Sequence, residues 1–319
     1  MTTQPPPHDV AVIITAMNAG ETIAHAVSSA LMQDRVAEVV VVDDGSRDDT
    51  ADVAAACDDG TGRLNLIRLP ENHGPAHGRN RAIASSTAPF ICILDADDFM
   101  APDRLEKMFN AGRGEWDFLA DSIIFTEGPD DLKGYDTLFA PDYSVPRFIS
   151  LSDMILGNMP KKDRHRRELG FVKPVMRRAF LEAHNLKYDE NLRLGEDVLF
   201  YSTALLKGAR FHLIPACGYY AVERANSLSS RHGTADLDRL ARALLTLEGD
   251  VADHGQSSRA VRQYRRNIEK RKALRDALDA KRSHGWIGFT KACGNAGRDA
   301  GYVVGELVRG KVATMIRGR

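Results

Sequence analysis

The chain has 319 residues, a formal net charge of −1 at pH 7, 43% hydrophobic residues and 27% charged residues. These are the values of a globular protein with room for one large or two ordinary domains. No apolar run reaches about 18 residues and the N-terminus has no basic stretch followed by an apolar core, so we expect neither a transmembrane helix nor a signal peptide. The four cysteines form no CxxC pair, which argues against a zinc ribbon or a disulfide framework and favours a reducing cytoplasm.

The charge is unevenly distributed along the chain. Residues 256–319 hold 16 Lys and Arg against 5 Asp and Glu, whereas the remainder holds 27 basic and 39 acidic residues. An acidic body with a basic tail predicts that the tail meets an anionic surface.

Strand and helix patterns alternate four times in the first 111 residues. Apolar runs predict strands over residues 10–14, 39–42, 64–69 and 90–94. Helical spacing predicts helices near residues 23–31, 76–85 and 102–111, and Ser46 with Asp49 resembles a capping box that opens a further short helix. This alternation predicts an open, doubly wound α/β sheet. Residues 1–8, which include three consecutive prolines, are expected to be a disordered leader.

Ligands bind doubly wound sheets beyond the carboxyl ends of the strands. The polar groups expected there are residues 15–18, Asp43 with Asp44, and Asp95 to Asp98. Three crowded carboxylates after residue 94 repel one another unless a cation joins them, and such oxygen clusters suit Mg²⁺ or Mn²⁺. The alternative is a turn in which one aspartate caps the helix that follows.

The rest of the chain is less regular. Residues 117–235 contain strand-like pieces at 118–120 and 122–125, and residues from 236 onward are helical and basic in composition. The basic run 161–167 could steer an anionic acceptor such as a lipid diphosphate, or could be a solvated loop. A GxGxxG fingerprint and a P-loop are both absent, so an NAD site is not expected.

Five segments taken together resemble glycosyltransferase family 2: IITAMN, VVVVDDGSRDDT, ENHGPAHGRNRAI, ILDADD and LRLGEDVLF. The resemblance covers roughly residues 9–232 and implies an inverting, metal-dependent enzyme of GT-A fold that uses nucleotide sugars. It implies a nucleotide-sugar-binding half at 9–116, an acceptor-binding half at 117–235 and a basic helical extension at 236–319. The sequence from FVKPVMRR to LRLGED is similar to that of glucosyltransferases of succinoglycan-type exopolysaccharide assembly.

The resemblance implies donor-binding roles for four residues. Thr15, with Ala16 beside it, and Asp44 would hold the uracil, and Arg79 would lie near the base or the phosphates. The chain departs from the family at Thr15, where many members carry Pro, and at Met17, where many carry Tyr. An aromatic contact with the base is therefore not expected.

Metal ligands also follow from the resemblance. Asp95 and Asp97 would form the DxD pair, with Asp97 or Asp98 contacting Mg²⁺ or Mn²⁺. His232 would be a further ligand, because GT-A enzymes often supply a late histidine; a solvated surface histidine is the alternative. His212 and His73 are weaker candidates.

The acid pair Glu196 and Asp197 precedes an apolar helical stretch. An inverting transfer needs a carboxylate that takes the proton from the attacking hydroxyl. The resemblance assigns this role to Asp197, with Glu196 orienting the acceptor. The alternative is a helix N-terminus stabilised by two acids.

The tail carries apolar residues at near-helical spacing from Trp286 to Val308, with basic residues between and after them. This pattern predicts a helix that lies on a membrane surface. A helix docked on the catalytic domain or on a second subunit is the alternative, and nucleic acid is disfavoured because no recognition motif accompanies the charge.

Together these features predict a cytoplasmic glycosyltransferase, peripheral to the inner face of the cell membrane. It would transfer a sugar, with UDP-glucose as the expected donor, to a polyprenyl-diphosphate-linked oligosaccharide. A nucleotidyltransferase and a non-catalytic scaffold of a glycan assembly complex remain as alternatives. The segment after the first strand, Asn18 to Glu21, has one glycine and no cation, which argues against the nucleotidyltransferase.

Overall fold

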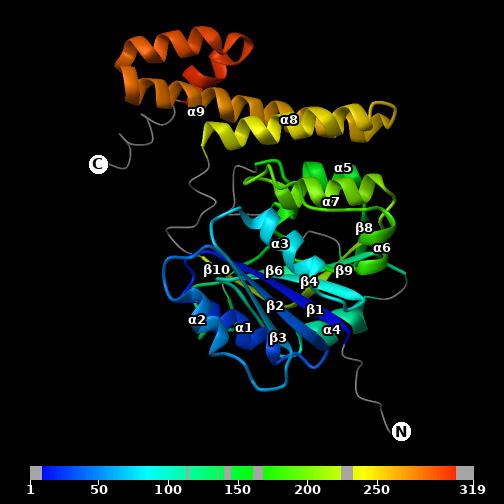
Figure 1. The fold of residues 1–319 in the computed structure, drawn as a ribbon. Coiled ribbons are helices and arrows are strands. Elements are labelled where there is room, and N and C mark those ends of the chain that lie inside the picture. The colour runs from blue at the N-terminus through cyan, green and yellow to red at the C-terminus, as the bar shows by residue number, and fades with distance from the viewer. Residues whose placement is uncertain are drawn as a thin grey trace. The chain divides into compact units, whose positions relative to one another are not determined.

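A computed structural model describes residues 9–112, 115–134, 136–139, 145–160, 168–223 and 233–306. The chain divides into two compact units, residues 1–227 and residues 228–319. The first unit contains a mixed sheet covered by helices, and the second consists of helices (Figure 1). Each unit is described by itself.

Four parallel strands form one half of the sheet: β1 (Val10–Ala16), β2 (Val36–Asp44), β3 (Leu64–Leu69) and β4 (Phe90–Asp95). They lie in the order β3-β2-β1-β4. The apolar side chains of β1, of residues 39–42 in β2 and of residues 91–94 in β4 are buried on both faces, whereas those of the edge strand β3 are half-buried. All four strands predicted from the sequence are observed.

Four helices connect or flank these strands: α1 (Ile23–Leu31), α2 (Thr50–Ala55), α3 (Pro75–Ala84) and α4 (Arg104–Ala111). Figure 1 shows α1 and α2 on one face of the sheet and α3 on the other, as right-handed crossovers demand. A Cβ on Gly78 would lie 2.8 Å from Cγ2 of Thr15, so only glycine allows α3 to approach β1 this closely.

The capping box predicted at Ser46 and Asp49 is wrong. Helix α2 begins after Asp49, whose side chain makes no capping hydrogen bond, and the Asp48 carboxylate accepts a hydrogen bond from the backbone N–H of Thr50 at 3.1 Å. Ser46 instead accepts a hydrogen bond from the backbone N–H of Asn18, at 2.8 Å. The Ser46 hydroxyl therefore fastens the loop after β2 to the loop after β1.

The strand order reverses beside β1, which places a switch point between β1 and β4. In the register of the sheet Thr15 lies opposite Asp95 and Ala16 lies opposite Asp43. Three of the polar groups predicted to gather at one edge are therefore neighbours on adjacent strands.

The sheet continues beyond β4 through β9 (Val175–Arg177), β6 (Phe118–Thr126) and β10 (Phe211–Val222). Strand β9 runs antiparallel between β4 and β6, and β6 and β10 are parallel. The short strands β5 (Phe99–Met100), β7 (Asp136–Thr137) and β8 (Arg147–Ile149) pair along β10 and β6. The helices of this half are α5 (Leu151–Leu156), α6 (Arg178–Ala183), α7 (Glu196–Leu206) and the 3₁₀ turn η1 (Leu169–Phe171).

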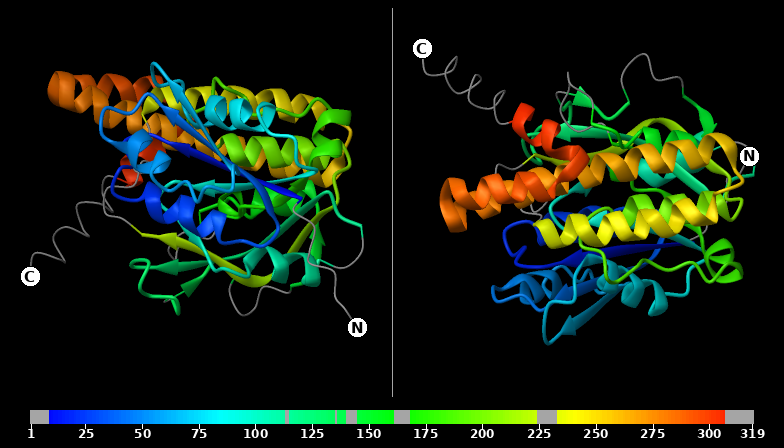
Figure 2. Two further views of the ribbon diagram at one scale, coloured as in Figure 1. Left: turned by 60° about the horizontal axis from the view of Figure 1, so that its bottom comes forward. Right: turned by 90° about the horizontal axis from the view of Figure 1, so that it is seen from above.

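The second unit pairs α8 (Thr234–Asp250) with α9 (Gly255–Asn295), followed by the 3₁₀ turn η3 (Gly297–Asp299). Figure 2 shows α8 and α9 running side by side. The backbone of Gly285 leaves the helical range (φ 63°, ψ −153°), so α9 is two helices that meet at a sharp bend. A Cβ on Gly288 would lie 2.5 Å from the carbonyl oxygen of Ala280, so the chain folds back tightly after the bend.

The bend changes the interpretation of the predicted tail helix. Phe289 and Val303 are buried against Ala277 of the preceding helix, so part of the apolar pattern forms a small core of the second unit. Trp286 and Ile287, at the bend, remain 57% and 84% exposed. Leu307 and Val308 lie outside the described residues, and no helix among the described ones is long and apolar enough to span a membrane.

Candidate active site

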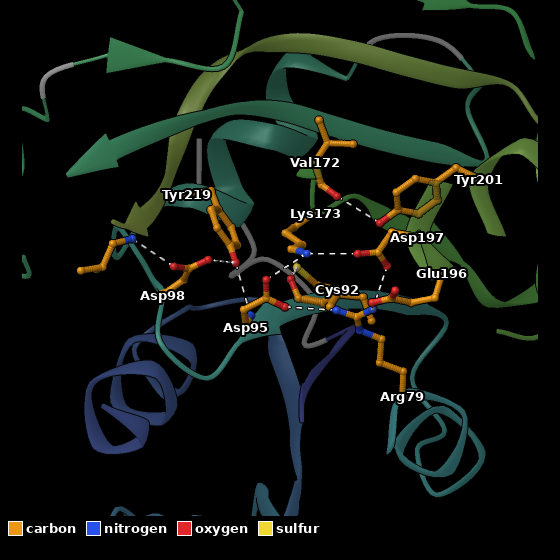
Figure 3. Close-up of polar contacts among 12 residues, drawn as sticks. Arg79, Cys92, Asp95, Asp98, Val172, Lys173, Glu196, Asp197, Tyr201 and Tyr219 are labelled. Atoms are coloured by element: carbon orange, nitrogen blue, oxygen red, sulfur yellow. Dashed lines mark hydrogen bonds and ion pairs between the residues drawn. The ribbon is translucent and has the colours of Figure 1, made fainter. Parts of the chain in front are cut away.

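Five charged side chains from four parts of the first unit meet at the switch point of the sheet. Asp95 ends β4, Arg79 lies in α3, Lys173 precedes β9, and Glu196 and Asp197 open α7. We call these five residues the ion cluster (Figure 3). The cluster joins both halves of the sheet, because Arg79 and Asp95 come from the first half and the other three come from the second.

Arg79 holds three carboxylates of the cluster. Its Nη1 lies 2.9 Å from Oδ1 of Asp197 and 3.2 Å from Oε1 of Glu196, and its Nη2 lies 3.3 Å from Oδ1 of Asp95. The side chain of Arg79 is 5% exposed. The rigid fork of a guanidinium suits such bridging of several carboxylates.

Lys173 bridges the second oxygens of the two aspartates. Its Nζ lies 3.0 Å from Oδ2 of Asp95 and 3.3 Å from Oδ2 of Asp197, and its side chain is 5% exposed. Each of these aspartates therefore has one oxygen on Arg79 and the other on Lys173. The result is a closed ring of two cations and two carboxylates.

The contacts of the ion cluster favour the charged forms of Lys173 and Asp95. Burial alone would lower the pKa of Lys173, but the carboxylates of Asp197 and Asp95 outweigh it and raise that pKa above its ordinary value. Burial would likewise raise the pKa of Asp95, but Lys173 and Arg79 hold it below its usual range. Glu196 is the exception, because burial and the nearby Asp197 raise its pKa.

The local backbone of α7 presents the acid pair to the cluster. Gly195 adopts a left-handed conformation (φ 74°), which turns the chain directly into the first helical turn. Glu196 and Asp197 lie in that turn, where the positive end of the helix dipole favours anions. The alternative of a merely stabilised helix N-terminus does not account for the contacts that both acids make with Arg79 on another element.

The aspartates that follow β4 have different environments. Asp97 is exposed, whereas Asp98 is buried and accepts hydrogen bonds from the hydroxyl of Tyr219 (2.8 Å) and the backbone N–H of Val222 (3.0 Å). Burial, together with the neighbouring carboxylates of Asp95 and Asp97, raises the pKa of Asp98 well above its usual range. Asp98 thus joins the segment after β4 to β10, and Asp97 is the exposed carboxylate of this segment.

The structure leaves the predicted metal set incomplete. Over the described ranges, no three His, Cys, Asp or Glu side chains form a group that could hold a metal ion. His232 and the basic run 161–167 lie outside the described residues. His212 lies opposite Leu119 near the start of β6, which is the end of the sheet away from Asp95, and its ring stacks on Phe148.

Asp44 orders the loop that follows β3. Its carboxylate accepts hydrogen bonds from the backbone N–H groups of His73 (2.8 Å) and Gly74 (2.7 Å) and from Nδ2 of Asn72 (2.8 Å). A carboxylate offers about four lone-pair sites, and these contacts use three of them. Asp44 and Thr15 lie at the same edge of the sheet, as predicted.

Lys173 was missed by the sequence interpretation. A signal was present, since Lys173 is the one charged residue in the apolar run from Phe171 to Met176. A lysine in such a run is expected to be buried and paired with a carboxylate.

Comparisons with known proteins identify the family. Residues 11–179 match the glycosyl transferase family 2 domain. The chain is 48% identical to succinoglycan biosynthesis protein ExoU of Rhizobium meliloti over 91% of its own length and 83% of that protein. It belongs to glycosyltransferase family 2. It is also 35% identical to succinoglycan biosynthesis protein ExoO of the same organism, over 69% of this chain and 62% of that protein.

Solved structures confirm the fold. The glycosyltransferase TarS of S. aureus, in complex with UDP-GlcNAc, superimposes with a TM-score of 0.56 at 18% identity, over 89% of this chain and 90% of that chain. The mannosyltransferase PcManGT of Pyrobaculum calidifontis, in complex with GDP-Man and Mn²⁺, superimposes with a TM-score of 0.52 at 18% identity, over 98% of this chain and 83% of that chain. The predicted GT-A fold with a helical C-terminal region is confirmed. The family assignment decides for a glycosyltransferase over a nucleotidyltransferase.

Proposed function

We propose that this glycosyltransferase transfers glucose from UDP-glucose, with inversion, to a polyprenyl-diphosphate-linked oligosaccharide in exopolysaccharide assembly of the succinoglycan type. The ion cluster carries the proposal, because it brings the donor-side Asp95 and the acceptor-side Asp197 onto the same two cations. The similarity to ExoU and ExoO supports the pathway, and the UDP-GlcNAc complex of TarS supports a UDP-sugar donor.

In the proposed reaction Asp197 accepts the proton of the acceptor hydroxyl as that oxygen attacks the anomeric carbon. The bond from the anomeric carbon to the diphosphate breaks in the same displacement, and UDP leaves with the electron pair. Glu196 lies beside Asp197 on Arg79 and orients the acceptor. A single in-line displacement inverts the anomeric configuration, so an α-linked donor gives a β-linked product.

The donor would lie across the switch point between β1 and β4. Thr15, Ala16 and the carboxylate of Asp44 would contact the uracil at the ends of β1 and β2. Arg79 would lie toward the phosphates from α3. The donor would then lie on the first half of the sheet, whereas Asp197 reaches the cluster from the second half.

The residues at the end of β4 fit a divalent cation of the Mg²⁺ or Mn²⁺ kind. Asp97 is an exposed carboxylate at the edge where the diphosphate is proposed to lie. Mg²⁺ is commonly held by one or two carboxylates together with substrate phosphates, so a complete protein cage is not required. Asp97 would hold the ion, with Asp98 behind it and His232 as a further ligand. When bound, the ion offsets charge on the leaving diphosphate.

Replacing Asp97 by Ala is expected to abolish metal-dependent UDP release. UDP is quantified with UDP-glucose and Mn²⁺ present, and addition of EDTA to the unmodified enzyme should give the same loss. Asp58→Asn, a change at another exposed aspartate, is the control and should leave the rate unchanged. Full activity of Asp97→Ala, or full activity in EDTA, would contradict the proposed metal site.

The second unit is proposed to contact the cytoplasmic face of the cell membrane through the bend of α9. Trp286 and Ile287 are exposed there, and Nζ of Lys281 lies 4.1 Å from the centre of the Trp286 ring. Residues 280–291 contain Lys281, Arg282 and Lys291 and no acid. An exposed aromatic and aliphatic pair with a lysine against the aromatic ring suits an anionic lipid surface.

Vesicle binding can be followed by tryptophan fluorescence, because the chain has two tryptophans and Trp116 is buried. The emission of Trp286 is expected to shift to shorter wavelength with phosphatidylglycerol vesicles and not with phosphatidylcholine vesicles. Ile287→Asp should weaken sedimentation with the anionic vesicles, whereas Leu245→Asp, at an exposed leucine of α8, should not. An unchanged emission spectrum would contradict the membrane contact.

A further inference from the structure

We propose that Lys173 is a positioning residue that fixes the orientation of the Asp197 carboxylate toward the acceptor. This inference rests on the proposed role of Asp197 as the base. Arg79 alone would hold Asp197 and Asp95 through one oxygen each, which leaves the carboxylates free to rotate about that contact. Lys173 takes the second oxygen of both, so neither carboxylate can rotate without breaking an ion pair (Figure 3).

The backbone that carries Lys173 is itself held in place. Nη2 of Arg104 donates to the carbonyl oxygen of Lys173 at 2.8 Å, and the Tyr201 hydroxyl donates to the carbonyl oxygen of Val172 at 3.0 Å. Pro174 follows and restricts residue 173 to an extended backbone. Two helices, α4 and α7, and the adjacent proline therefore fix the backbone position from which the lysine side chain extends into the cluster, which is the kind of support a precise site needs.

The contact distances also distinguish the two oxygens of Asp197. Oδ1 receives the 2.9 Å contact from Arg79, whereas Oδ2 lies 3.3 Å from Lys173. The longer contact is the weaker one, so the lone pairs of Oδ2 are held less tightly than those of Oδ1. We therefore assign Oδ2 as the oxygen that takes the proton, with Lys173 orienting it.

The charge of the cluster depends on Lys173. Two cations face three carboxylates in the ion cluster, and without Lys173 the guanidinium of Arg79 alone would contact all three carboxylates. Like charges held close together repel, so Asp95 and Asp197 would move apart. A displacement of the base by about 1 Å from its aligned position can lower the rate on the order of 10²-fold.

A double-mutant cycle tests whether Lys173 acts through Asp197. Lys173→Met is expected to lower kcat about 10²-fold in the unmodified enzyme. In the Asp197→Asn background the same change should lower kcat by less than about threefold, because the effects of substituting residues that act as a unit are not additive. Equal factors in both backgrounds would overturn the inference. A near-normal kcat of Asp197→Asn would instead remove the proposed base, so the two failures are distinguishable.

A second pair of variants covers the case in which Lys173→Met does not fold. Lys173→Arg keeps the positive charge, and Lys173→Gln keeps an N–H donor without it. We expect the arginine variant to retain kcat within about tenfold and the glutamine variant to lose about 10²-fold, with circular dichroism and thermal melting confirming that both are folded. Lys107→Met, at an exposed lysine paired with Asp103, is the control. Equal activity of the arginine and glutamine variants would contradict the role of the charge.

Discussion

Asp197→Asn is expected to lower kcat by about 10²- to 10⁴-fold, the usual contribution of a general base. Asparagine has the shape of aspartate and cannot take the proton of the acceptor hydroxyl. The cations of the cluster keep other partners, since Arg79 still contacts Glu196 and Asp95, and Lys173 still contacts Asp95. The rate is measured as UDP release with a membrane extract that supplies the acceptor.

Asp189→Asn is the matched control for that loss. Asp189 is a carboxylate of the same half of the sheet and accepts a hydrogen bond from the backbone N–H of Asn191 within its own turn. It makes none of the recorded ion-pair contacts of the cluster, so its variant should keep the normal rate. An Asp197→Asn enzyme that folds and turns over at a near-normal rate would contradict the assignment of the base.

Arg104→Met is expected to destabilise the first unit by about 3–5 kcal/mol, the cost of leaving one partner of a buried ion pair alone. The side chains of Arg104 and Asp121 are 0% and 1% exposed, and Nη2 of Arg104 lies 2.7 Å from Oδ1 of Asp121. The change also removes the hydrogen bond to the carbonyl oxygen of Lys173. The free energy of unfolding is measured by urea titration.

Two further variants give this prediction its controls. Arg104→Met combined with Asp121→Leu should be less destabilised than Arg104→Met alone, because no buried carboxylate is left without its partner. Arg210→Met breaks a more exposed pair with Glu115 and Asp117, and should destabilise the unit much less than Arg104→Met does, because water screens the exposed charges. Similar losses for Arg104→Met and Arg210→Met would show that burial of the first pair contributes little.

The first half of the sheet was predictable because each strand is a continuous apolar run that ends in polar residues. Residues 39–42 and 90–94 could only be buried strands, and their ends at Asp44 and Asp95 then had to meet at one edge. The family resemblance added the roles of Asp97 and Asp197, which periodicity alone does not supply.

The second half was less predictable because its strands depend on distant partners. Strand β9 has three residues and exists because β4 and β6 lie on either side of it. Strand β10 is interrupted by a register shift between Ile214 and Tyr219, which hides its length in the sequence. The apolar run marks Lys173 as a buried lysine, but its partners are seen only when the fold brings it beside two aspartates that lie 78 and 24 positions away in the chain.

The tail shows the limit of helical periodicity. The spacing from Trp286 onward correctly indicated helix, but it did not show that Gly285 bends the chain. The bend directs Phe289 into the unit's own core and leaves Trp286 at the surface. An amphipathic pattern alone therefore does not say which of its apolar residues are free for a membrane.

The most direct test of the central claim is UDP release in the presence of Mn²⁺ and a lipid extract. UDP-glucose, UDP-galactose and UDP-N-acetylglucosamine are compared as donors, with GDP-mannose assayed for GDP release. The account predicts release from UDP-glucose that is lost with Asp97→Ala and with Asp197→Asn. No release from any of these donors, with the folded enzyme and the extract both present, would contradict it.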